Sequence, residues 1–357
     1  MDEKQSLVER EVMRFDDLPG WADDDHLAAY QAFAASAPAI LKSGPAGMVD
    51  VCRAVLDASQ PPSNRQAARR FFEDRFTPTR VKHGEPSGLL TGYYEPQLNG
   101  SRERTSAFSV PVLSRPQDLI NLVEEAQRGA LAEQMTHARR GADGQLMPFF
   151  TRREIDEGAL EDRGLELLFL ADPVELFFMQ VQGSGLIQLT DGSSLRLIYD
   201  GKNGHPYTSV GRYLIESGVF CDSEMNLQAL LEWLKADLER ARDVLWCNES
   251  YVFFRVLGAE NDTRPLGTNG IPLTPLRSLA VDTRFYALGQ PVYILAPTLD
   301  HIREGTGGIR RLMVAHDVGS AIKGAERGDL FCGSGPLAGA KAGMTKHPVN
   351  FFGLVPK

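Results

Sequence analysis

Two aspartates in the last sixth of the sequence stand where carboxyl groups could do chemistry. Asp317 follows the apolar run 312–315, and Asp329 opens the short apolar piece 330–331, with a glycine-flanked turn between them. Aspartate is disfavoured inside strands, so each needs a local reason to stand at a strand edge. It can cap backbone N–H groups of a turn, or it can face a cleft and transfer protons. These residues alone favour the structural role, and both roles stay open.

A pair of adjacent tyrosines forms a second candidate site. Residues 88–96 predict a strand that runs into a turn and carries Tyr93 and Tyr94 near its end. Aromatic faces stack on the apolar faces of sugar rings, so the pair suits a glycan platform. Because side chains alternate along a strand, the plainer interpretation places the two rings on opposite faces, with one of them buried.

A polar turn, QGSG at residues 182–185, lies inside a stretch that predicts a β-meander. The Asp191-Gly192 pair between apolar runs is a strong hairpin signal. The predicted strands are residues 167–170, 175–182, 186–189 and 195–199.

A second polar turn, GKNGHPY, occupies residues 201–207. Pro206 suits the first turn of a helix that ends at Gly218. The free N–H groups of a helix start, together with Lys202 and Asn203, suit an anionic or hydroxyl-rich ligand. An ordinary tight turn before a capped helix fits the same residues equally well.

Apolar residues at helical spacing predict the scaffold around these turns. Residues 16–78 look helical, with Asp23 to Asp25 as candidate caps of the first helix. Two more helices of this region, residues 46–59 and 64–76, are separated by Pro61-Pro62. Further along the chain we predict a helix over 119–133 and a single long helix over 222–246 that is capped near Ser223.

The bulk properties restrict the class of protein. The chain has 357 residues, enough for two domains, with 43% hydrophobic residues and a formal net charge of -9. The negative charge argues against a nucleic-acid surface. No stretch approaches the roughly 20 apolar residues of a membrane span, and the acidic start has no secretory-signal pattern. The four cysteines form no C-x-x-C pair or zinc pattern; we expect isolated thiols, with a Cys221–Cys247 bridge left open.

Six motifs, in one order, resemble the lytic murein transglycosylases of the MltA family. The resemblance extends from about Phe15 to about Leu354, and residues 278–295 resemble the first half of the family's aspartate-bearing domain. The spacing of the last two acids is longer here than in the family, with the extra residue near 325–328. The motifs are FDDLPGW from Phe15, TGYY-x-P from Thr91, QGSG from Gln182, GKNG-x-x-Y from Gly201, N-x-S-Y-V-F-F from Asn248 and D-x-G-x-A-I-K-G from Asp317.

The resemblance implies a mainly β fold with a helical N-terminal segment. The family fold is a double-psi β-barrel that carries an inserted second β-domain, with a glycan groove between them. In this chain the barrel would combine residues 1–105 and 245–357, and the insert would be residues 106–244.

The same resemblance assigns roles to the candidate residues. Asp329 falls on the catalytic position, Asp317 would raise the pKa of Asp329 or hold the turn, and Asp282 is expected to be structural. No metal or cofactor is implied. The implied substrate-binding residues are Thr91, Tyr93, Tyr94, Gln182, Gly183, Ser184, Gly185, Lys202, Asn203 and Gly204.

The implied activity is cleavage of the β-1,4 bond between MurNAc and GlcNAc of peptidoglycan with formation of a 1,6-anhydro ring. One carboxylic acid protonates the leaving oxygen and then takes the proton of the C6 hydroxyl, which attacks C1. Because that nucleophile is tethered, its effective molarity replaces an activated water. Leu330 and Phe331 could supply the apolar setting that raises the pKa of Asp329.

Two other functions stay compatible with the same residues: a non-catalytic glycan-binding module, and a hydrolase that uses water with Asp317 and Asp329 as a carboxylate pair. We expect a monomer whose partners are peptidoglycan glycan strands, in the periplasm or associated with the outer membrane. Cell-wall synthesis or division complexes are possible partners that the sequence does not identify. No cysteine near the N-terminus supports the lipid anchor of some family members.

Overall fold

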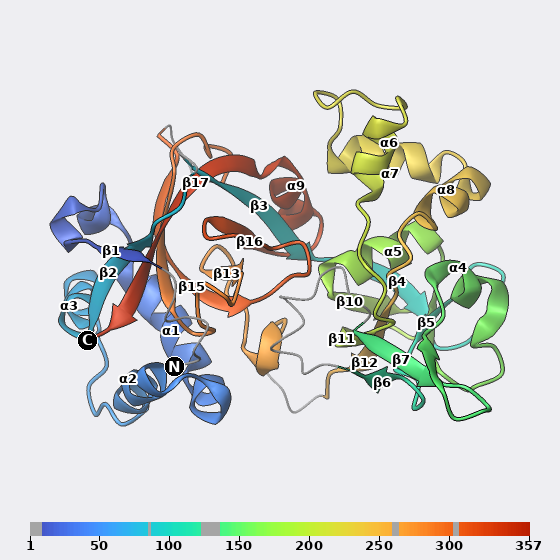
Figure 1. The fold of residues 1–357 in the computed structure, drawn as a ribbon, viewed down its shortest axis with the longest axis horizontal. Coiled ribbons are helices and arrows are strands. Elements are labelled where there is room, and N and C mark those ends of the chain that lie inside the picture. The colour runs from blue at the N-terminus through green and yellow to red at the C-terminus, as the bar shows by residue number, and fades with distance from the viewer. Residues whose placement is uncertain (1–8, 85–86, 123–135, 259–263, 303–306) are drawn as a thin grey trace. The chain divides into compact units, whose positions relative to one another are not determined.

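The computed structural model describes residues 9–84, 87–122, 136–258, 264–302 and 307–357. The chain divides into two compact units, each with its own sheet (Figure 1). In the described part of the chain, no helix combines the length and the apolar character that crossing a bilayer needs. The first unit comprises Met1–Tyr93, Leu266–Gly333 and Met344–Lys357, and the second Tyr94–Pro265 and Ser334–Gly343.

The first unit is built on an eight-stranded sheet in the order β1-β2-β17-β14-β15-β13-β16-β3. An additional pairing of β17 with β3 closes six of these strands into a ring. The sheet-rich character agrees with the sequence, and the double-psi crossing and the predicted domain boundaries stay predictions. The strands are β1 (Arg10–Val12), β2 (Phe76–Val81), β3 (Gly88–Glu95), β13 (Ser278–Val281), β14 (Pro291–Ala296), β15 (Ile309–Asp317), β16 (Arg327–Ser334) and β17 (Lys346–Pro356).

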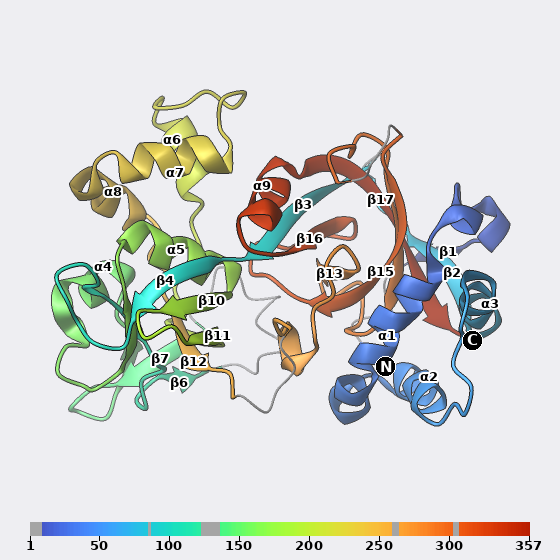
Figure 2. The ribbon, with the colours of Figure 1, turned by 180° about the vertical axis from the view of Figure 1, so that it is seen from behind.

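Three N-terminal helices cover part of this sheet, as the sequence predicts: α1 (His26–Ser43), α2 (Ala46–Leu56) and α3 (Arg65–Arg75). Asp25 and Asn64 cap α1 and α3 by accepting from backbone N–H groups three residues on. Both ribbon views place α1 beside β15 (Figures 1 and 2).

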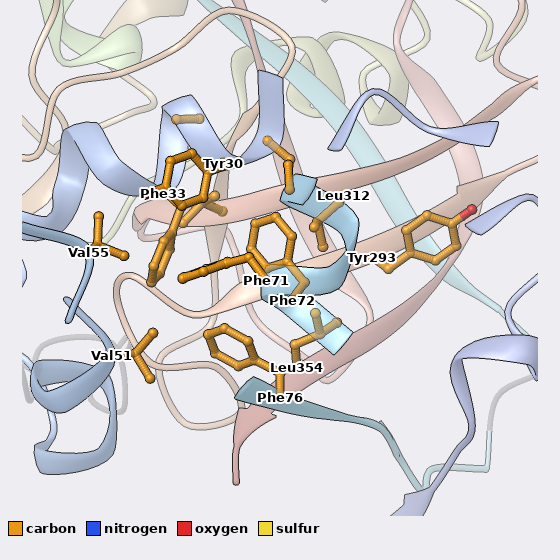
Figure 3. Packing of buried hydrophobic residues seen from close by; sticks show 14 of the residues in the cluster. Tyr30, Phe33, Val51, Val55, Phe71, Phe72, Phe76, Tyr293, Leu312 and Leu354 are labelled. Atoms are coloured by element: carbon orange, nitrogen blue, oxygen red, sulfur yellow. The ribbon is translucent and has the colours of Figure 1, made fainter. Parts of the chain in front are cut away.

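The core between these helices and the sheet is rich in aromatic rings (Figure 3). Phe33 and Phe72 are fully buried and meet edge to face, with ring centroids 6.2 Å apart. Each such side chain contributes about 1.5–3 kcal/mol by burial. From the sheet, Tyr293, Leu312 and Leu354 complete the cluster.

A buried ion pair ties the chain before α1 to the sheet. The carboxylate of Asp24 accepts hydrogen bonds from both terminal nitrogens of Arg277, at 2.9 and 3.0 Å, and from the backbone N–H of Leu312 at 2.7 Å. The two side chains are only 4% and 9% exposed. The sequence offered Asp24 only as a helix cap, whereas the cap of α1 is Asp25.

The second unit contains a six-stranded sheet in the order β12-β11-β10-β4-β9-β5 and a three-stranded sheet β6-β7-β8. The predicted Asp191-Gly192 hairpin is confirmed: Gly192 has a φ of +83°, and β10 and β11 pair antiparallel beside it. The strands are β4 (Gln97–Ser101), β5 (Val110–Leu113), β6 (Ile120–Asn121), β7 (His137–Arg140), β8 (Leu146–Pro148), β9 (Glu166–Leu170), β10 (Ser184–Leu189), β11 (Ser194–Lys202) and β12 (Val252–Val256).

The predicted strand at residues 175–182 is wrong, because this segment is the helix α5 (Pro173–Gln182). Asp172 accepts from the N–H of Val174, and Pro173 takes the first helical position, which is a strong start signal. The helix contributes to two clusters, Leu176 and Met179 to one and Phe177 to the other. Burial on both sides therefore hides the helical period that the sequence would otherwise show.

Three further helix predictions need correction. The single helix over 222–246 is two helices, because Asp237 caps a second start, and Asn226 rather than Ser223 caps the first. The helix expected from Pro206 begins later, after its cap Ser209, although it does end just before Gly218. The helix predicted at 119–133 falls mostly outside the described residues, and its beginning is β6. The remaining α-helices of the described residues are α4 (Arg152–Glu154), α6 (Val210–Glu216), α7 (Leu227–Lys235), α8 (Leu238–Leu245) and α9 (Pro336–Met344).

All four cysteines lie in the described residues and none forms a disulfide bond, so the structure contains no Cys221–Cys247 bridge.

Candidate active site

Asp317 and Asp329 flank one small residue of the first unit's sheet. Ala280 on β13 pairs with Asp317 of β15 on one side and with Asp329 of β16 on the other. Directly paired residues point to the same face of a sheet, so both carboxyl groups lie on the face that carries the methyl group of Ala280. Two strand spacings put their Cα atoms roughly 9–10 Å apart.

An irregularity in β15 selects which residue faces Ala280. Leu279 pairs with Ala315, but the next residue, Ala280, pairs with Asp317, so His316 is passed over. Such a bulge re-aims the side chains that follow it. The ring of His316 is fully buried, and its Nδ1 lies 2.7 Å from Oγ of Ser278.

Asp329 is a half-buried carboxyl group with one strong hydrogen-bond donor. Oγ1 of Thr91, on β3, donates to Oδ1 of Asp329 at 2.8 Å. Burial raises the pKa of Asp329 to about 6; the Thr91 hydrogen bond and the charge of Arg327 oppose this rise, and the charge of Asp317 adds to it. Its neighbours Leu330 and Phe331 are almost completely buried. Asp329 can therefore exchange a proton near neutral pH.

Asp317 accepts four hydrogen bonds. Oδ1 accepts from the backbone N–H of Thr268 at 3.1 Å, from its hydroxyl at 2.9 Å and from the N–H of Val318 at 2.9 Å. The phenol of Tyr93 donates to Oδ2 at 3.1 Å. Burial raises the pKa of Asp317, although all of these donors oppose the shift.

Asp282 is bound within its own turn and to the loop that joins the other two acids. It accepts from the N–H groups of Arg284 and Gly324, at 3.1 and 2.8 Å, and forms an ion pair with the Arg284 guanidinium. Burial raises the pKa of Asp282, but hydrogen bonds from Arg284 and Gly324 outweigh it, so the pKa is lowered. These contacts suit the structural role that the sequence indicated.

We expect Asp282→Ala to lower the free energy of unfolding by about 1–3 kcal/mol, because Gly324 and Arg284 lose their charged acceptor. Because the pKa of Asp282 is lowered in the fold, its contribution is full above the unfolded pKa of about 3.9 and is lost as the pH falls through the lowered value. Thermal unfolding of the variant checks this. An unchanged melting temperature together with lost activity would instead make Asp282 chemical.

The adjacent tyrosines face opposite ways, as strand alternation requires. Tyr93 is only 8% exposed, and its ring lies 5.2 Å from that of Phe331. Tyr94 is half-buried and belongs to the second unit. The buried ring of Tyr93 leaves little face for a sugar to stack on, whereas Tyr94 keeps part of its surface.

In the second unit the structure brings Tyr94 and the QGSG segment together. The backbone N–H of Tyr94 donates to Oε1 of Gln182 at 2.9 Å. Gly183 ends α5 with a φ of +82°, and Ser184 and Gly185 begin β10.

The GKNG turn is held separately by the chain around β12. Asn203 is fully buried, and its Nδ2 donates to the carbonyls of Phe150 and Glu249, both at 2.8 Å. Gly204 has a φ of +91°, and a Cβ there would come within 2.7 Å of a backbone nitrogen. Lys202, at the end of β11, is half-buried and is the member of this turn with a cationic side chain.

Sequence reasoning missed two residues of the first unit's site. Thr268 begins the short helix η5 (Thr268–Gly270), and no spacing rule links it to Asp317, which lies 49 residues further on. Arg327 stands two positions before Asp329 on β16, hence on the same strand face. The two-residue spacing from Asp329 is therefore the sequence signal from which Arg327 could have been predicted.

Comparison with known proteins defines the class of this fold. Residues 89–255 match a family model described as the MltA specific insert domain, and residues 277–355 match a 3D domain model. A solved membrane-bound lytic murein transglycosylase from Agrobacterium tumefaciens is 33% identical, with 98% of each chain covered and a TM-score of 0.87. The chain belongs to the MltA family, which confirms the resemblance seen in its motifs.

Other relatives agree. MltA from Neisseria gonorrhoeae is 32% identical, with 97% of this chain and 92% of that chain covered and a TM-score of 0.79. Escherichia coli MltA with bound chitohexaose is 28% identical, with 93% and 90% covered and a TM-score of 0.68. A curated relative, membrane-bound lytic murein transglycosylase A of Vibrio cholerae, is 34% identical over 72% of this chain but only 63% of its own length. The match thus spans less than two thirds of that relative.

Proposed function

We propose that this chain is a lytic transglycosylase that cleaves the β-1,4 bond between MurNAc and GlcNAc of peptidoglycan. The observation that carries the proposal is Asp329: a half-buried carboxyl group, bound by Thr91, whose pKa is raised to about 6. Family membership and the names of the relatives support the substrate class. The complex of the Escherichia coli relative with chitohexaose supports binding of a β-linked glycan chain.

In the proposed reaction Asp329 acts first as acid and then as base. Its proton goes to the glycosidic oxygen as the bond from that oxygen to C1 of MurNAc breaks. The resulting carboxylate takes the proton of the C6 hydroxyl, and O6 forms a bond to C1, which gives the 1,6-anhydro ring. Asp329 regains from the C6 hydroxyl the proton that it gave to the glycosidic oxygen, so no other proton donor or acceptor is consumed. The tethered hydroxyl also removes the need for an activated water.

The remaining site residues have binding and structural roles in this proposal. Asp282 holds the loop between the acids, and Asp317 acts on Asp329 without transferring a proton to the sugar. The enzyme is a monomer in the periplasm or at the outer membrane, and its partners are peptidoglycan strands. Residues 1–105 and 245–357 form a double-psi barrel, and residues 106–244 form the inserted domain. The glycan-binding residues are Thr91, Tyr94, Gln182, Gly183, Ser184, Gly185, Lys202 and Gly204, with Tyr93 and Asn203 as buried supports.

Analysis of the products from purified sacculi tests the proposal directly. A lytic transglycosylase releases muropeptides with 1,6-anhydro ends. A hydrolase that uses Asp317 and Asp329 as a pair would release reducing ends, and a binding module would retain the sacculi without releasing anything. Either of the last two outcomes contradicts the proposal.

Activity should fall as the pH rises through about 6. Asp329 must carry a proton at the start of the reaction, and its pKa is raised to about 6. The protonated fraction is therefore high below this pH and decreases about tenfold for each unit above it. Initial rates of anhydro-muropeptide release between pH 4.5 and 8 measure this basic limb. A rate that stays constant up to pH 8 would exclude Asp329 as the acid.

The basic limb should move to higher pH in Arg327→Gln. The guanidinium charge lowers the pKa of Asp329, so removing it lets burial raise that pKa further. Arg327→Lys keeps the charge and is the matched control, with a limb close to that of the wild type. A shift to lower pH in Arg327→Gln would contradict this electrostatic role.

A further inference from the structure

The hydrogen bonds of Asp317 restrict where this carboxyl group can carry a proton. Oδ1 accepts from two backbone N–H groups, those of Thr268 and Val318, and from the Thr268 hydroxyl. A backbone N–H can only donate, so Oδ1 must stay unprotonated. A proton on Asp317 would have to sit on Oδ2, where the phenol of Tyr93 lies at 3.1 Å.

Tyr93 is well suited to be that donor. It lies among the buried residues Leu273, Ala280, Ile322 and Phe331. Burial raises the pKa of Tyr93 well above its ordinary value, and the charges of Asp317 and Asp329 raise it further. The phenol thus keeps its proton and can direct it to Oδ2.

One strand supplies a hydroxyl to each acid. Thr91 and Tyr93 are two positions apart on β3, hence on one face of it. Thr91 donates to Asp329 and Tyr93 to Asp317. The two carboxyl groups share one sheet face, but each therefore has its own hydroxyl donor.

We propose that Tyr93 and Thr268 are positioning residues that hold Asp317 as a fixed carboxylate beside Asp329, across Ala280. The catalytic consequence rests on the proposed function. A fixed negative charge keeps Asp329 protonated by repulsion between like charges. It also stabilises the positive charge that develops at C1 of the sugar in the transition state.

Few other titratable groups face this pair in the described residues. Arg327 and Cys332 of β16 interact electrostatically with Asp329 and Tyr93, respectively. His316, beside Asp317 on β15, turns its Nδ1 to Ser278. The Tyr93 phenol and the Thr268 hydroxyl are thus the two side-chain donors whose removal should report on Asp317 alone.

Tyr93→Phe tests the proposal because it removes the hydroxyl and keeps the ring against Phe331. Asp317 should then protonate more readily, so its charge no longer raises the pKa of Asp329, and the basic limb moves to lower pH. This shift is opposite to that of Arg327→Gln. We expect kcat to fall about tenfold with KM within about twofold, because a hydrogen bond to a charged group is lost.

Three variants serve as controls and rescue. Thr268→Val should act like Tyr93→Phe, and Thr268→Ser should restore the wild-type limb because it keeps the hydroxyl. Tyr286→Phe makes the same chemical change at a fully buried tyrosine of the same unit, whose hydroxyl has no hydrogen-bond partner among the described residues. It should leave the pH profile unchanged.

A carboxyl titration followed by carbon-13 NMR separates this inference from the proposed function. The Asp317 carboxyl of Tyr93→Phe should titrate at higher pH than in the wild type, whether or not the enzyme is active. If wild-type protein releases no anhydro products, the proposed function fails. The titration then shows by itself whether Tyr93 holds Asp317 as a carboxylate. If Asp317 titrates at the same pH in Tyr93→Phe as in the wild type, the inference is wrong. It is also wrong if the titration of Asp317 changes in active enzyme while kcat and the basic limb of the pH–rate profile stay as in the wild type.

Discussion

The Asp329→Asn variant is expected to release no detectable 1,6-anhydro muropeptides from purified sacculi. The substitution is nearly isosteric, and the amide oxygen can still accept the hydrogen bond that Thr91 donates to Oδ1. The amide cannot give a proton to the leaving oxygen or take one from the C6 hydroxyl. Both halves of the proposed reaction fail together, and losing general acid–base catalysis costs about 10²–10⁴-fold in rate.

Two further measurements make this result specific. Thermal unfolding and binding to insoluble peptidoglycan should match the wild type, because neither packing nor the glycan contacts change. Asp317→Asn is the comparison variant; it should lose less activity and more stability. Its amide nitrogen cannot accept the hydrogen bond that Tyr93 donates to Oδ2, and the bonds from Thr268 and Val318 lose their charged acceptor. Near-normal turnover by Asp329→Asn, with Asp317→Asn folded but inactive, would move the catalytic role to Asp317.

The second large effect concerns stability. Asp24→Ala should lower the free energy of unfolding by about 3–5 kcal/mol, because it leaves a buried guanidinium without its carboxylate. The side chain of Arg277 is 9% exposed, and the acceptors that it retains among the described residues are the backbone carbonyls of Leu312 and Asp25. The backbone N–H of Leu312 loses its acceptor as well. Urea unfolding followed by tryptophan fluorescence measures the loss.

Asp23→Ala is the matched control, because Asp23 is the preceding residue, has the same charge and is exposed. Its effect should stay within about 0.5 kcal/mol. Equal losses for the two variants would mean that the negative charge near α1, rather than the pairing with Arg277, stabilises the fold.

Local signals in the sequence predicted much of the fold and part of the site. Asn64 and the Asp191-Gly192 pair act through neighbours a few residues away, so the helix α3 and the hairpin β10–β11 were predicted correctly. The placement of Asp317 at the end of a strand could likewise be read from the apolar run before it. Asp329 was predicted to open a strand, but it lies inside β16, which begins two residues earlier at Arg327.

Contacts between distant segments could not be read in this way. Asp24 and Arg277 are 253 residues apart, and Thr91 and Asp329 are 238 apart. The bulge at His316, which turns Asp317 rather than its neighbour toward Ala280, depends on pairing with β13. The helix α5 was misread because its residues are buried on both sides and have lost the contrast between an apolar and a polar face.

The pairing of β17 also sets the order in which the chain can fold as it is synthesised. β17 pairs with β2, β14 and β3, and the hydrogen bond from Thr79 to Gly353 spans 274 residues. At roughly 5–20 residues per second, the edge of β2 waits roughly 15–55 s for its partner, while Tyr94–Pro265 of the second unit emerges whole and can fold meanwhile. The first unit is therefore the one whose open strand edges need protection from aggregation during synthesis.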